Sequence, residues 1–167
     1  METVRNSWLE LEEALRRQIR LMDEYAELQL EIRHAMDARD WPGLEQLLRS
    51  LEEKTRELAE VEETRERLWE ESCAEVHADP SDSFYAVTLR LPEDTRAQLA
   101  ELRQGLRLSS LNLKGVNQAL AVYVQTAGSL IQAYLKEVLP ELKGSLYGRG
   151  GELRGGHRVS MVLNTHI

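Results

Sequence analysis

The sequence predicts an all-α protein with three parts: an elongated antiparallel helical hairpin, a long third helix that completes a three-helix coiled-coil-like bundle, and a flexible C-terminal tail. Three observations predict this fold. Leu, Glu, Arg and Ala dominate the 167 residues, apolar side chains recur every three or four positions, and glycines cluster late in the chain. The length favours one domain, which we expect over residues 1–142, with the tail over residues 143–167.

A heptad-like apolar stripe predicts the first helix, over about residues 3–39. Gln18 and Gln29 occupy positions that the pattern skips, and acids and arginines fill the other faces. The stripe ends before Asp40, which can cap a second helix, and Pro42, which the first turn of a helix tolerates because its missing N–H has no helical partner there. The stripe consists of Trp8, Leu11, Leu15, Met22, Tyr25, Ile32 and Met36.

A second stripe predicts a helix over about residues 41–77, and Lys54 and Arg65 interrupt it. Two long helices joined by a short turn form an antiparallel hairpin, in which facing residue numbers should sum to about 80. Trp8 should therefore lie near Trp69 and Cys73. The stripe consists of Leu44, Leu47, Leu51, Leu58, Val61 and Leu68.

The connection to the third helix has two parts. Residues 77–83 carry turn chemistry and are expected to form a loop. In residues 84–91, the apolar side chains of Tyr85, Val87, Leu89 and Leu91 alternate, which fits either a short extended segment or an irregular connection packed along the hairpin.

Pro92 and the acids that follow it predict the start of a third helix, over about residues 92–139. Small and polar residues between Gly105 and Gly115 weaken its first half, where we expect a kink or a break, and Pro140 ends it. Its stripe consists of Leu99, Leu102, Leu106, Leu113, Val116, Leu120, Tyr123, Ala127, Leu130 and Tyr134.

Charge and motifs exclude several functions. The chain carries 29 acidic and 21 basic residues, and an acidic excess argues against nucleic-acid binding. Residues 1–78 hold 21 acids and 11 bases, a net charge of −10, so the two halves are expected to do different jobs. The single cysteine fits a reducing compartment, and the N-terminus does not resemble a signal peptide. We expect no catalytic site, no metal site and no cofactor, and we interpret paired acids such as Glu12-Glu13 as solvated helix faces.

An uncharged run between Lys114 and Lys136 is long enough for a membrane span, but its amide and hydroxyl side chains argue against insertion. Val124, Ile131, Leu135 and Val138 add a second apolar edge to the third helix there. Two interpretations remain open. The wide stripe is either part of a three-helix core or homodimer seam, or a surface kept for the helix of another protein.

These features together resemble the FlgN family of flagellar export chaperones, over nearly the whole chain. The resemblance rests on the acidic hairpin with Glu53-Lys54, on Leu113-Lys-Gly-Val-Asn117-Gln-Ala-Leu120 in the third helix, and on the tail segment Ser145-Leu-Tyr-Gly148. The family often shows two asparagines three residues apart in the third helix. Asn117 matches the second of them, whereas Lys114 stands in place of the first.

The resemblance implies a cytosolic, non-enzymatic chaperone that binds the hook-associated proteins FlgK and FlgL, prevents their premature assembly and delivers them to the export gate protein FlhA. It implies that Tyr147, presented by Leu146 and Gly148, docks on FlhA. A helical substrate segment could then lie in a groove on the third helix. A chaperone for another type III substrate and a homodimeric coiled-coil adaptor are the alternatives. The expected groove residues are Val116, Asn117, Leu120, Val124, Ile131 and Leu135.

Overall fold

The structure, a computed structural model, describes the backbone of residues 2–138 and the side chains of residues 7–138. These residues form four helices and no strand, which confirms the all-α prediction. The helices are α1 (Glu2–Ala38), α2 (Trp41–Glu75), α3 (Phe84–Thr88) and α4 (Glu93–Val138). The chain divides into two compact units, Met1–Val122 and Tyr123–Ile167. The boundary expected after residue 142, and the tail expected to be flexible, lie outside the described residues.

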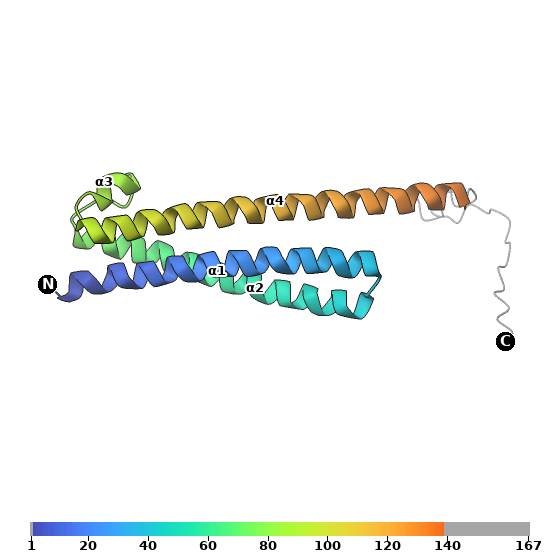
Figure 1. The fold of residues 1–167 in the computed structure, drawn as a ribbon, viewed down its shortest axis with the longest axis horizontal. Coiled ribbons are helices and arrows are strands. Elements are labelled where there is room, and N and C mark those ends of the chain that lie inside the picture. The colour runs from blue at the N-terminus through green and yellow to red at the C-terminus, as the bar shows by residue number, and fades with distance from the viewer. Residues whose placement is uncertain (1, 139–167) are drawn as a thin grey trace, which may run out of the picture. The chain divides into compact units, whose positions relative to one another are not determined.

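The α1–α2 hairpin is set by its short turn (Figure 1). Arg39 has a φ of 58°, in the left-handed region, and α1 ends just before it. One Asp40 carboxylate oxygen then accepts a hydrogen bond from the Gly43 N–H at 3.0 Å, and Pro42 lies in the first turn of α2. A side-chain cap and a proline at the helix start are the features that the sequence offered for this turn.

The predicted hairpin register is confirmed. The Trp8 and Trp69 ring centroids lie 6.3 Å apart in an edge-to-face arrangement, and Cys73 belongs to the same buried cluster. Near the middle of the hairpin, Lys54 Nζ lies 2.7 Å from Glu24 Oε2. Lys54 interrupts the apolar stripe of α2 and links the two helices through charge. This pairing raises the pKa of Lys54, chiefly through the hydrogen bond to Glu24.

Within the first unit, α4 packs beside α1 in a parallel register. Leu99, which is fully buried, and Leu102 join Leu11 of α1 in the core cluster. Farther along, Gln29 Nε2 donates a hydrogen bond to Asn117 Oδ1 at 3.1 Å, across 88 residues of sequence. Gln18 and Gln29, the two polar residues within the apolar stripe of α1, are both buried, with exposed fractions of 2% and 3%.

The expected break in α4 is absent, since one helix runs without interruption from Glu93 to Val138. Gly105 has a packing role: a Cβ atom there would lie 3.2 Å from Ile19 Cδ1 of α1. The missing side chain thus leaves room for the tip of the Ile19 side chain, and the helix continues through Gly105 despite the low helix propensity of glycine.

Residues 84–91 correct the expectation of an extended or irregular segment, because they contain the short helix α3. Ser83 caps it by accepting a hydrogen bond from the Ala86 N–H at 3.3 Å. Val87 and Leu91, four residues apart, are buried, whereas Tyr85 is 67% exposed and Leu89 49% exposed. The alternation in the sequence therefore reflects two pairs of residues, each spaced four apart as on one side of a helical turn. Val87 and Leu91 face inward, and Tyr85 and Leu89 face solvent.

An aromatic stack holds α3 against the open end of the hairpin. The Phe84 ring stacks on Trp69 with centroids 5.6 Å apart. Trp69 Nε1 donates a hydrogen bond to the Pro80 carbonyl at 3.2 Å, which ties the loop after α2 to the same stack. The guanidinium of Arg90 donates hydrogen bonds to the carbonyls of Val76 and His77. These contacts fix the connection between α2 and α4, so α3 has a defined place beside the start of α4.

Candidate partner-binding surface

The described residues offer little for catalysis. No group of His, Cys, Asp and Glu within residues 7–138 could hold a metal ion. Cys73 is fully buried, and burial, with a smaller contribution from Asp82 and Asp79, raises the pKa of its thiol. A buried cysteine with a raised pKa is a poor nucleophile, because the thiolate is the reactive species.

One of the paired acids differs from the sequence interpretation. Glu12 is only 8% exposed, so it belongs to the packed face of α1. Its neighbour Glu13 is exposed and lies 3.4 Å from Arg20 Nη2, as expected of a solvated acid. The sequence pattern could not separate the two, since adjacent residues of a helix point about 100° apart and either could face inward.

The first half of the expected groove lies in the Met1–Val122 unit and is partly covered. Val116 and Leu120 are half-buried. Asn117 is exposed overall, but its side-chain oxygen accepts the hydrogen bond from Gln29. These residues of α4 therefore contribute to intramolecular packing, and they leave limited apolar surface for a partner.

The second half lies in the Tyr123–Ile167 unit and is open. Val124 is 47% exposed, Ile131 61% and Leu135 46%. Three further residues, which the sequence analysis placed on the apolar stripes but not in the groove, are exposed beside them: Leu130 at 66%, Tyr134 at 64% and Val138 at 52%. We call this set of residues the α4 apolar face. It consists of Val124, Leu130, Ile131, Tyr134, Leu135 and Val138.

The α4 apolar face is continuous along one side of the helix. At about 100° per residue, its side chains span roughly 140° of the helix circumference, and they extend about 21 Å along the axis. The polar side chains of Gln125, Ser129 and Gln132 fall on the opposite side. No charged residue lies between Lys114 and Lys136. Scattered exposed apolar residues are normal on proteins, but a contiguous apolar stripe is typical of an interaction surface.

The expected gate-docking residues, Leu146, Tyr147 and Gly148, lie beyond Val138 and outside the described part of the chain. Their assignment stays a prediction from the resemblance of the tail segment.

Residues 7–155 match the family model described as FlgN protein. The chain belongs to the FlgN family. The match includes the hairpin, all of α4 and the tail segment around Tyr147, so the resemblance inferred from the sequence is confirmed. No curated protein and no solved structure gives a significant match.

Membership in the FlgN family supports a role as a flagellar export chaperone. FlgN is a chaperone family and is not known for enzymes. None of the helices between residues 2 and 138 has an apolar stretch that could traverse a membrane. The α4 apolar face is accordingly a candidate protein-binding surface in a protein of a chaperone family.

Proposed function

We propose that this protein is a cytoplasmic export chaperone that binds the hook-associated proteins FlgK and FlgL, prevents their premature assembly and delivers them to the export gate protein FlhA. The observation that supports this proposal most is the uncharged, exposed α4 apolar face in a chain of the FlgN family. The function requires neither a nucleotide nor a covalent step.

The mechanism follows from the chemistry of the face. A hook-associated protein has terminal segments that are helical in the assembled filament, and before assembly such a segment would expose its own apolar stripe. Laying that stripe on the α4 apolar face removes both apolar surfaces from water, at roughly 25 cal/mol per Å². Ordering the substrate segment offsets part of this gain. The complex then prevents self-association by covering the residues that assembly needs.

A single substitution tests the substrate site. Ile131→Asp places a charge at the centre of the face, and the 61% exposure of Ile131 means that folding is little affected. Leu111→Asp is the matched control, because Leu111 is 58% exposed on the same helix but points about 160° away from Ile131. Calorimetric titration with purified FlgK and FlgL should show at least about a tenfold loss of affinity for Ile131→Asp only.

The Leu120→Asp variant is a less clean probe, because Leu120 is half-buried and its change also affects packing. Equal binding of FlgK by the Ile131→Asp variant and the unaltered chain would contradict the proposed site. If neither FlgK nor FlgL binds the unaltered chain and sedimentation shows a stable dimer, the homodimeric adaptor replaces the chaperone. Binding of a different type III substrate to the same face would change the cargo assigned here.

The delivery step is assigned to the tail. Tyr147→Ala should weaken binding to the cytoplasmic domain of FlhA while FlgK affinity stays within about twofold. Loss of both activities in this one variant would contradict the proposed division between α4 and the tail.

A further inference from the structure

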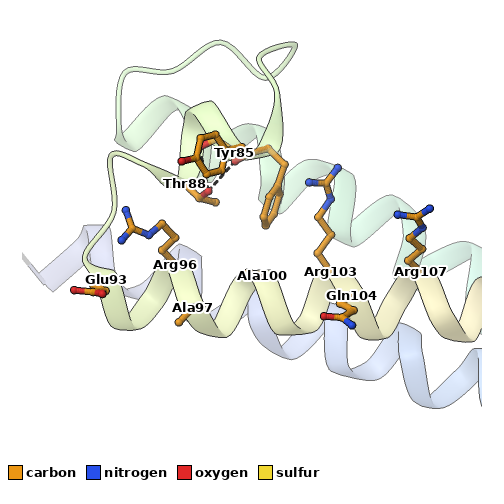
Figure 2. A pocket seen from close by; sticks show the side chains of 10 residues that line it. Tyr85, Thr88, Glu93, Arg96, Ala97, Ala100, Arg103, Gln104 and Arg107 are labelled. Atoms are coloured by element: carbon orange, nitrogen blue, oxygen red, sulfur yellow. Dashed lines mark hydrogen bonds between the residues drawn. The ribbon is translucent and has the colours of Figure 1, made fainter.

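A second surface of the first unit lies between α3 and the beginning of α4, and the proposed function does not use it. It is an open groove with a volume of about 690 Å³. Figure 2 shows the side chains of Arg96, Arg103 and Arg107 along α4, on the side that carries α3. We call this open groove, with the residues that line it, the α3–α4 groove.

The wall of this groove is held in place by ring stacking, by a cation–π contact and by hydrogen bonds within α3. Phe84 stacks on Trp69, and the guanidinium carbon of Arg103 lies 4.6 Å from the Phe84 ring centroid. The Thr88 hydroxyl donates to the carbonyls of Phe84 and Tyr85, at 2.9 Å and 3.2 Å. The Tyr85 side chain projects from this fixed wall and is 67% exposed. An aromatic side chain on a rigid support is suited to bind a partner, because little conformational entropy is lost.

The three arginines form a row. Their spacings of seven and four residues place them on one side of α4, over about 16 Å of helix. Ala97 and Ala100 also line the groove, and their small side chains leave space between the arginines and α3. Glu93, an acid, lines the same groove at the start of α4. The groove therefore combines three cations and one acid with small apolar side chains and an aromatic wall.

Among the described residues, the arginines of this row differ from other arginines of the first unit in their ion pairing. Elsewhere in the first unit, Arg49 lies 2.6 Å from Glu45 and Arg67 lies 2.7 Å from Glu71. Within residues 7–138, by contrast, no ion pair involves a guanidinium of the row. This contrast occurs in a protein with a net charge of −8. A guanidinium offers five N–H donors in a planar fork that matches a carboxylate, so the row can bind several acidic side chains.

We propose that the α3–α4 groove binds an acidic helical segment of a partner protein. Its carboxylates would pair with the arginine row, and an apolar side chain would enter between Ala100 and Tyr85. The charge row favours this occupant because a helix presents side chains at spacings of four and seven residues on one face, as α4 does. A single phosphate could not contact guanidiniums spread over about 16 Å.

The test is a fluorescence anisotropy titration of the full chain with a labelled helical peptide. The peptide carries glutamates at relative positions 0, 4, 7 and 11, which serve either orientation along the arginine row, and leucines between them. The comparison peptide has glutamine at the same four positions. The groove variant is Arg103→Glu with Arg107→Glu. The matched control, Arg16→Glu with Arg56→Glu, makes the same charge change at exposed arginines of the hairpin.

The proposal expects the acidic peptide to bind at least about tenfold more tightly than the glutamine peptide, with affinity that falls as salt rises. The groove variant should lose at least about tenfold in affinity, and the control variant less than about threefold. Tyr85→Ala, a change at an exposed side chain, should also weaken binding while circular dichroism stays unchanged.

The proposal would be overturned if the acidic peptide does not bind up to about 1 mM, or if both peptides bind with equal affinity. Equal losses of peptide affinity in the groove and control variants would also overturn it. So would a DNA oligonucleotide that binds the protein more tightly than the acidic peptide does, if the groove variant abolishes that binding. The experiment contains neither FlgK nor FlhA, so its result is independent of the function proposed above.

Discussion

The packing of α4 on the hairpin can be tested at Leu99. This side chain is fully buried in the cluster that joins Leu11 of α1, Leu68 of α2 and Val87 of α3. Leu99→Ala removes three carbon atoms from a site where all four helices meet. Buried leucine-to-alanine changes lower the free energy of unfolding by about 2–5 kcal/mol, and we expect about 3 kcal/mol here, because close packing of helices limits collapse of the cavity.

The assay is urea unfolding followed by tryptophan fluorescence. Trp8 and Trp69 lie in or beside this cluster and report its unfolding, whereas Trp41 is 61% exposed and should change little. Leu108→Ala is the control on the same helix, since Leu108 is 59% exposed and its change should stay within about 0.5 kcal/mol. Similar losses for the two variants, or a loss under about 1 kcal/mol for Leu99→Ala, would refute the packing of α4 described here.

Three further predictions concern the hairpin. A Cβ at Gly43 would clash with the Asp40 carboxylate that caps α2, so Gly43→Ala should destabilise the protein by about 1 kcal/mol in urea unfolding. In the Asp40→Ala variant, where this carboxylate is gone, adding Gly43→Ala should instead increase the free energy of unfolding. Lys54→Met should cost under about 1 kcal/mol at pH 7. Pairing with Glu24 raises the pKa of Lys54 above 10.5, so the stability that Lys54 contributes is complete below about pH 10 and decreases as the pH rises through its folded-state pKa. Urea titrations of the unaltered protein and of Lys54→Met at several pH values should therefore show a difference in unfolding free energy that shrinks at high pH. Cys73 should react with a thiol reagent only as fast as the core opens, because it is fully buried. The control is an exposed cysteine introduced at Ser110, and equal reaction rates at the two positions would contradict the burial of Cys73.

The sequence predicts the helices well because their signals are repeated and local. Each stripe has six or more apolar positions, and Asp40 with Pro42 gives an explicit start signal for α2. The hairpin register follows from the short turn, which leaves the two helices few ways to pair. The pairing of Trp8 with Trp69 required no other information.

The predictions for residues 84–91 and for the expected break in α4 were wrong because contacts between distant parts of the chain decide the structure there. Alternation over 84–91 is compatible with a strand, yet α3 forms because Ser83 caps it and Phe84 stacks on Trp69, a residue distant in sequence. Gly105 suggested a break in α4, but its role depends on the neighbouring Ile19 of α1. A single sequence does not show which residues lie opposite one another, so the role of such a glycine cannot be read from propensity alone.

The candidate site was predicted in part for the same reason. Periodicity identified the apolar residues of α4, but it could not show that Val116 and Leu120 are half-buried whereas Leu130 and Tyr134 are exposed. The α3–α4 groove was missed entirely, because it requires α3. The spacing of Arg96, Arg103 and Arg107 was the one sequence signal that could have indicated it.

Site-specific photocrosslinking to FlgK shows directly whether the α4 apolar face holds the substrate. A photoreactive amino acid replaces Ile131 in one chain and Leu111 in another, and each is irradiated with purified FlgK. The account predicts a crosslink from position 131 to a terminal segment of FlgK and none from position 111, because only position 131 lies on the α4 apolar face. Binding of FlgK with no crosslink from position 131, or equal crosslinks from both positions, would contradict the claim that this face holds the substrate.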